Sequence, residues 1–183
     1  MASDGFYDAG LLRQIATNLF YGWGYNFYRA ENQLRADDQL VRSQAAGLLS
    51  QTMAAVDAAE SDYRREHLPP PSRSKPFPDA EAVTAAQRLE RLARAIGALS
   101  AAIQHQAAPD NDRMTQRYRD EAGTLETLIQ IDERLVGQCD LLRSMVQGLD
   151  CVAILAKMAA LEAGQEAIHG TLQRREAVLM GRG

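Results

Sequence analysis

Three residues in the last quarter of the chain, Glu162, Glu166 and His169, have the types and spacing of metal ligands. Positions i, i+4 and i+7 share one face of a helix, so two carboxylates and an imidazole would lie close together. Imidazole and carboxylate groups together suit transition metals such as iron and manganese. The chemistry that these residues could support is therefore metal-dependent, and it needs further ligands from other helices.

Glu166 and His169 form a Glu-x-x-His pair. Ferritin-like di-iron bundles carry this element on two helices and add one Glu from each of two others. No second Glu-x-x-His pair is present, and Glu31 or Glu121 could contribute only if packing happened to bring them near. The three residues also flank an apolar stripe, as on an ordinary solvated helix face. We expect no bound metal or cofactor and keep a metal-binding, ferritin-like protein as the alternative function.

Other catalytic signatures are missing from the sequence. Cys139 and Cys151 lie in apolar stripes without a Cys-x-x-Cys motif, which predicts buried thiols rather than a disulfide framework. No glycine-rich phosphate loop and no Gly-x-Ser-x-Gly motif occurs. The sequence identifies no catalytic residue, which leaves enzymatic activity open but favours a non-enzymatic role.

Aromatic residues gather at the start of the chain, where eight of the 11 fall within the first 28 positions. The densest group is Phe20, Tyr21, Trp23, Tyr25, Phe27 and Tyr28. Successive helical residues differ by about 100°, so these rings would point around most of a helix and one core could not bury them all. The group predicts a contact surface for another subunit, a partner or a ligand. The alternative is that the rings cap and complete the core.

The elements that must position these residues are helices, because apolar residues recur at spacings of three and four along most of the chain. The expected segments are an aromatic-rich stretch over 1–24, helices over 25–67, 79–107, 110–147 and 150–180, and a linker over 68–78. Long helices with short connections predict an all-α, antiparallel four-helix bundle. We expect one domain over 1–183.

Particular residues mark the ends of these segments. The linker holds five of the six prolines and is predicted to connect two helices, with a polyproline II ligand as the alternative. Asp79 and Asp150 are predicted N-caps, and Gly148 is a predicted C-terminal cap residue. Asp38 falls within an apolar stripe, so it must be paired, solvated or at an end of the packed region.

Charge and composition limit the classes of partner. A net charge of −4 over 183 residues argues against nucleic-acid binding, which needs a surplus of cations. The sequence predicts no membrane span and no signal peptide, hence a cytoplasmic location. The expected function is that of an interaction, adaptor or assembly protein, homo-oligomeric or bound to a protein partner through its aromatic N-terminal segment.

Overall fold

The computed structural model describes residues 4–23, 34–73, 76–106 and 122–180, and no strand occurs among them. A short 3-10 helix, η1 (Asp4–Phe6), precedes the first α-helix. The α-helices are α1 (Ala9–Gly22), α2 (Leu34–His67), α3 (Ala80–His105), α5 (Ala122–Val146), α6 (Cys151–Ala156) and α7 (Met158–Leu179). The all-α helical bundle predicted from the sequence is confirmed.

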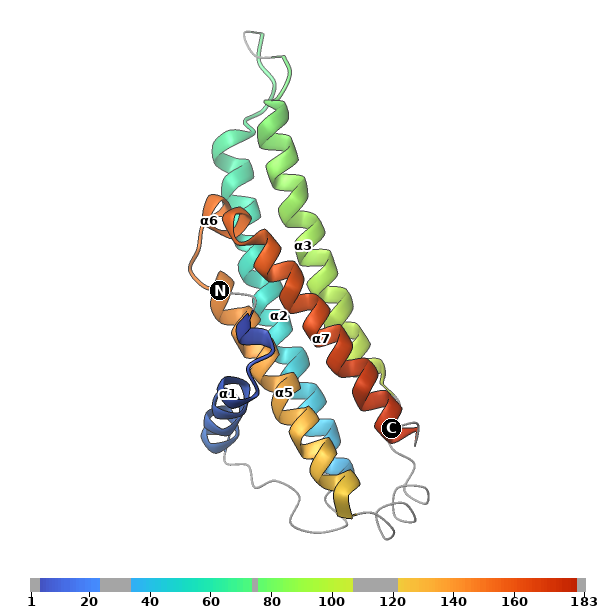
Figure 1. Cartoon of the computed structure of the whole chain (residues 1–183). Helices are drawn as coiled ribbons and strands as arrows, with labels where there is room; N and C mark the ends of the chain where they lie inside the picture. Colours follow the sequence, from blue (N-terminus) through green and yellow to red (C-terminus); the bar gives the residue numbers. More distant parts are fainter. Residues whose placement is uncertain (1–3, 24–33, 74–75, 107–121, 181–183) are drawn as a thin grey trace.

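The four long helices lie side by side, with α2 packed against both α3 and α5, and α7 packed against α5. Figure 1 shows α2 and α5 running towards one end of the molecule and α3 and α7 running back. The turn between α2 and α3 extends beyond the other helices at that end. The short helix α1 lies outside the long helices, beside α5.

Three predicted helix ends are confirmed. The carboxylate of Asp79 accepts a hydrogen bond from the backbone N–H of Glu81 at 2.8 Å, and that of Asp150 accepts one from Ala153 at 2.8 Å. Gly148, two residues after α5, has φ +71°, in the left-handed region that glycine adopts without strain. The described residues of the linker, 68–73 and 76–78, lie outside helices.

Two parts of the fold differ from the prediction. Residues 9–22 form a separate helix, α1, which the expected aromatic-rich stretch over 1–24 did not include. The helix expected over 150–180 is interrupted at Lys157, whose backbone N–H bonds to the Ile154 carbonyl three residues back. This tighter turn separates α6 from α7 without proline or glycine. The parts of two predicted helices at 25–33 and 110–121 lie outside the described residues.

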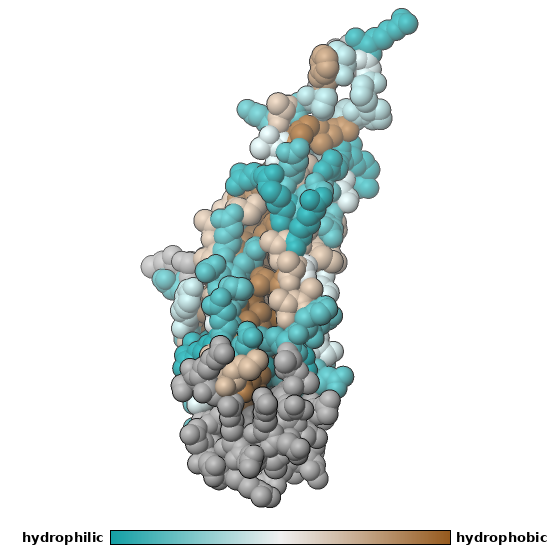
Figure 2. Space-filling view, turned by 90° about the vertical axis from the view of Figure 1, so that its right-hand side faces the viewer, coloured by the Kyte–Doolittle hydropathy of each residue, from teal (hydrophilic) through white to brown (hydrophobic). Residues whose placement is uncertain are grey.

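The core is a continuous apolar seam along the long helices. Its fully buried residues include Val41, Leu49 and Val56 of α2, Leu89, Ile96 and Ile103 of α3, Leu135 and Leu142 of α5, and Leu161 and Ile168 of α7. In the face drawn in Figure 2, hydrophilic side chains flank a narrow apolar strip along the long axis. None of the described helices has both the length and the apolarity needed to cross a bilayer.

Candidate functional site

The helix α1 is fixed to α5 by one apolar stripe. Leu12, Ala16 and Phe20, each four residues after the last, are buried. Of these residues, Leu12 faces Gly137 of α5, where a Cβ atom would lie only 2.5 Å from the Leu12 carbonyl oxygen. The two backbones can approach this closely only because position 137 has no side chain.

The segment before α1 is fixed in a similar way. Phe6 is fully buried, and a Cβ atom at Gly164 of α7 would lie 2.5 Å from its ring. The side-chain amide of Gln138 donates to the Phe6 carbonyl at 2.9 Å, and the Thr171 hydroxyl donates to the Gln138 oxygen at 2.8 Å. These buried polar groups are satisfied, so the N-terminal segment has a defined position on α5 and α7.

The opposite side of this segment carries exposed apolar groups. Tyr21 is 88% exposed, Tyr7 61% and Leu11 40%. Residues ten apart lie within about a quarter turn on an α-helix, so Leu11 and Tyr21 mark the two ends of one outer face of α1. Gln14 and Asn18 lie exposed between them. We call Tyr7, Leu11 and Tyr21 the outer aromatic face.

The structure separates the aromatic residues that the sequence grouped together. Phe20 belongs to the core, and its ring meets that of Trp23 edge to face, with centroids 5.4 Å apart. Trp23 is half-buried and Tyr21 points to solvent. The three remaining members of the predicted group, Tyr25, Phe27 and Tyr28, lie outside the described residues. Phe20 therefore completes the core, as the alternative interpretation expected. Tyr21 is exposed, so it stays a candidate for the predicted contact surface.

The predicted metal ligands Glu162, Glu166 and His169 lie exposed on α7. The His169 ring is 3.0 Å from the side-chain amide of Gln173, between the two Nε2 atoms. Within the described part of the chain, no three His, Cys, Asp or Glu side chains are grouped closely enough to hold a metal. Glu31 and Glu121, the possible further ligands, lie outside that part.

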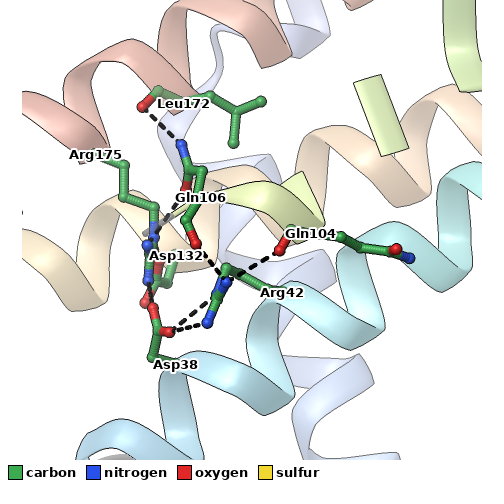
Figure 3. Close-up of polar contacts among 7 residues, drawn as sticks. All are labelled: Asp38, Arg42, Gln104, Gln106, Asp132, Leu172 and Arg175. Atoms are coloured by element: carbon green, nitrogen blue, oxygen red, sulfur yellow. Dashed lines mark hydrogen bonds and ion pairs between the residues drawn. The ribbon is translucent and has the colours of Figure 1, made fainter. Parts of the chain in front are cut away.

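The polar site that sequence reasoning missed centres on Arg175 of α7, whose side chain is 2% exposed (Figure 3). Its guanidinium donates to the carboxylate of Asp132 on α5 at 2.7 Å and to that of Asp38 on α2. Asp38 is also bound by Arg42, 2.7 Å away. Of the three outcomes expected for Asp38, the structure shows the first, because Asp38 is paired with two arginines.

The same network reaches the end of α3. Arg42 donates to the backbone carbonyls of Gln104 and Gln106. The last carbonyls of a helix have no N–H partner within the helix, and an arginine side chain can supply one. The Gln106 side chain bonds to the Leu172 carbonyl of α7 at 3.2 Å. The network therefore joins α2, α3, α5 and α7 at one end of the bundle. We call Asp38, Arg42, Asp132 and Arg175 the charge network.

The charge network is balanced, with two carboxylates and two guanidinium groups. Burial alone would lower the pKa of Arg175, but the charges and hydrogen bonds of Asp132 and Asp38 outweigh burial and raise it. An arginine guanidinium keeps its proton at neutral pH, so Arg175 is a cation in this network. This guanidinium is buried and donates to the carboxylates of Asp132 and Asp38 and to the side-chain oxygen of Gln106, so the arrangement suits helix positioning.

The sequence contained a signal for this network. Leu161 and Ile168 precede Arg175 at intervals of seven, so the arginine occupies a core position of the same helical stripe. Asp132 likewise lies four residues after Leu128 on α5, in its apolar stripe. Charged residues at core positions of three helices predict mutual pairing, but only the fold shows which ones meet.

The two cysteines are buried and free, as predicted. Burial is the largest cause that raises the thiol pKa of both Cys139 and Cys151, and the nearby carboxylates Asp140 and Asp150 add to it. Nucleophilic chemistry requires the thiolate. These residues therefore serve as small apolar groups in the core.

Comparisons of this chain with protein-family models, with curated proteins and with solved structures give no match.

Proposed function

We propose that this protein is a non-enzymatic interaction module, of the adaptor or assembly type, that binds a protein through its outer aromatic face. The observation that carries the proposal is the exposure of Tyr21 on a helix whose opposite side is fixed to α5. Tyrosine is enriched among the residues that dominate binding energy, because it offers a large amphipathic surface with few rotatable bonds. The partner is another protein or a second copy of this chain.

The rigidity of α1 supports the proposal. A contact surface that is already ordered in the free protein loses little conformational entropy on binding. Buried Phe6, Leu12 and Phe20 hold the segment on one side, so the exposed Leu11 and Tyr21 have fixed relative positions on the other. We assign this role to the cytoplasm, in keeping with two cysteines that are free thiols.

The proposal predicts that Tyr21→Ser and Tyr7→Ser reduce binding without reducing stability. Both side chains are exposed, so their loss should change the free energy of unfolding by no more than about 0.5 kcal/mol. Each tagged variant is expressed in the organism's own cells, and quantitative mass spectrometry compares the proteins recovered with it. Sedimentation velocity measures self-association of the same variants.

The matched control is Met180→Ser, which removes a comparably exposed apolar residue at the end of α7. We expect the tyrosine variants to lose a defined partner, or self-association, that Met180→Ser retains. Identical recovered proteins and identical sedimentation for all variants and the unmodified protein would exclude the outer aromatic face as a binding surface.

A further inference from the structure

A groove of about 490 Å³ lies at the end of the bundle from which the linker projects. Its walls are the last turns of α2 and the turn between α5 and α6. Small residues of α2, among them Ala55 and Ala59, leave room along its floor. Three carboxylates, from Asp62, Glu66 and Asp150, lie along its edges, and all three residues are exposed.

The groove is negatively charged. Asp62 is ion-paired with Arg65 on the same helix, the Glu66 carboxylate lies 3.9 Å from the ring nitrogen of His67, and the Asp150 carboxylate caps α6. Among the residues that line the groove, His67 is the one basic group beside these three carboxylates. Tyr63 lies in the groove, where burial is the largest cause that raises its pKa and the carboxylates of Asp79 and Glu81 add to it. The start of α3 therefore adds negative charge to the same end of the molecule. The complementary occupant is a segment that is basic and partly apolar.

The linker of this same chain has that chemistry. From Leu68 to Pro78 it contains two basic residues and no acidic one. Phe77 within it is 83% exposed, and Val152 at the groove is 68% exposed, so two of the most exposed large apolar side chains lie at this end. Proline restricts the unbound linker, which lowers the entropy lost when it docks.

The position of the linker favours docking in the groove of a second copy over docking in the groove of its own chain. Figure 1 shows the linker extending beyond the ends of α2 and α3, away from the α5–α6 turn. Linker and groove nevertheless lie at the same end, because the linker begins directly after His67, the last residue of α2. A two-fold axis at this end lets each copy place its linker in the groove of the other, which gives a closed dimer.

We propose that two copies associate end to end, with the linker residues Arg73 and Phe77 of each copy seated in the groove of the other beside Asp62 and Glu66. Phe77 supplies the apolar anchor and Arg73 the charge that complements the groove. This inference goes beyond the proposed function and uses a different surface, at a distance from α1.

Sedimentation velocity on the full chain, from roughly 1 to 100 µM, the range in which a small interface dissociates, tests the inference. The variants are Phe77→Ser, Arg73→Glu and the pair Asp62→Lys/Glu66→Lys. We expect dimers for the unmodified protein and dissociation constants raised roughly tenfold or more for each variant. Combining Arg73→Glu with Asp62→Lys/Glu66→Lys should restore the dimer, because opposite charges face each other again.

Arg91→Glu, on an exposed side chain of α3 away from the linker, is the matched control and should leave the dimer intact. A dimer that survives both Phe77→Ser and the charge changes overturns the inference. So does an unmodified protein that stays monomeric, even if its groove binds a basic peptide of another protein. Loss of the dimer in Tyr21→Ser alone would also overturn it, while supporting the outer aromatic face.

Discussion

Replacing Arg175 with leucine is expected to lower the free energy of unfolding by about 3–5 kcal/mol. The substitution leaves the carboxylate of Asp132, which is fully buried, without its guanidinium partner. It also leaves Asp38 with only Arg42. A buried carboxylate that loses an opposite charge either carries a less compensated negative charge or takes up a proton, and both destabilise the fold. Chemical denaturation followed by circular dichroism measures the effect.

Two controls isolate the charge network. Arg174→Leu removes an exposed arginine from the neighbouring position and should change stability by no more than about 0.5 kcal/mol. The double variant Arg175→Leu/Asp132→Leu removes both partners of the buried pair, so it should be more stable than Arg175→Leu alone. Equal effects of Arg174→Leu and Arg175→Leu would show that the charge network does not hold the helices together.

Gly137→Ala is expected to destabilise the protein by about 1–3 kcal/mol, the usual cost of forcing extra atoms into a packed contact. The new Cβ would lie 2.5 Å from the Leu12 carbonyl oxygen, and because this is a backbone atom the whole of α1 must shift. Trp23, the single tryptophan, follows α1 and packs beside Phe20, so its fluorescence reports the displacement.

Gly47→Ala and Gly170→Ala are the matched controls, because both glycines lie within helices and, apart from the adjacent backbone of the same helix, nothing lies within 4 Å of the added Cβ. Alanine favours a helix over glycine by about 1 kcal/mol, so these two variants should be neutral or more stable. An increase in stability for Gly137→Ala, with unchanged Trp23 fluorescence, would contradict the close packing of α1 on α5.

The helices themselves could be predicted because local signals agree with the fold. The stripe through Leu89, Leu92, Ile96 and Ile103 is buried as its spacing predicts, and Asp79 and Asp150 cap the helices that follow them. Such signals depend on residues within a few positions of one another. They can therefore be recognised in the sequence without knowledge of the tertiary structure.

Features that depend on distant residues could not be predicted. The stripe of Leu12, Ala16 and Phe20 is short, and only the close approach of Gly137 shows that α1 packs on α5. Arg175 and Asp38 are 137 positions apart, so their pairing is a property of the bundle. The helix is interrupted at Lys157 without a proline or glycine, so the sequence carries no signal for this break. Phe20 is buried and Tyr21 is exposed because one side of α1 faces α5 and the other faces solvent. The sequence alone did not show which side that is.

Arg175 and Gly137 contribute to different parts of one arrangement. The charge network joins the four long helices at one end, where we expect it to favour one register of the helices over others. Gly137 and Gly164 then let the N-terminal segment lie closely against the bundle. The result is a rigid support that presents the outer aromatic face to solvent.

The most direct measurement of that face is site-specific photo-crosslinking in cells, with p-benzoylphenylalanine in place of Tyr21. The same group in place of Gln51, an exposed residue of α2, is the control. A protein that binds the outer aromatic face should give a discrete adduct from position 21, either with a partner or with a second copy, and none from position 51. No adduct from position 21, or the same adducts from both positions, would contradict the proposal that this face binds a protein.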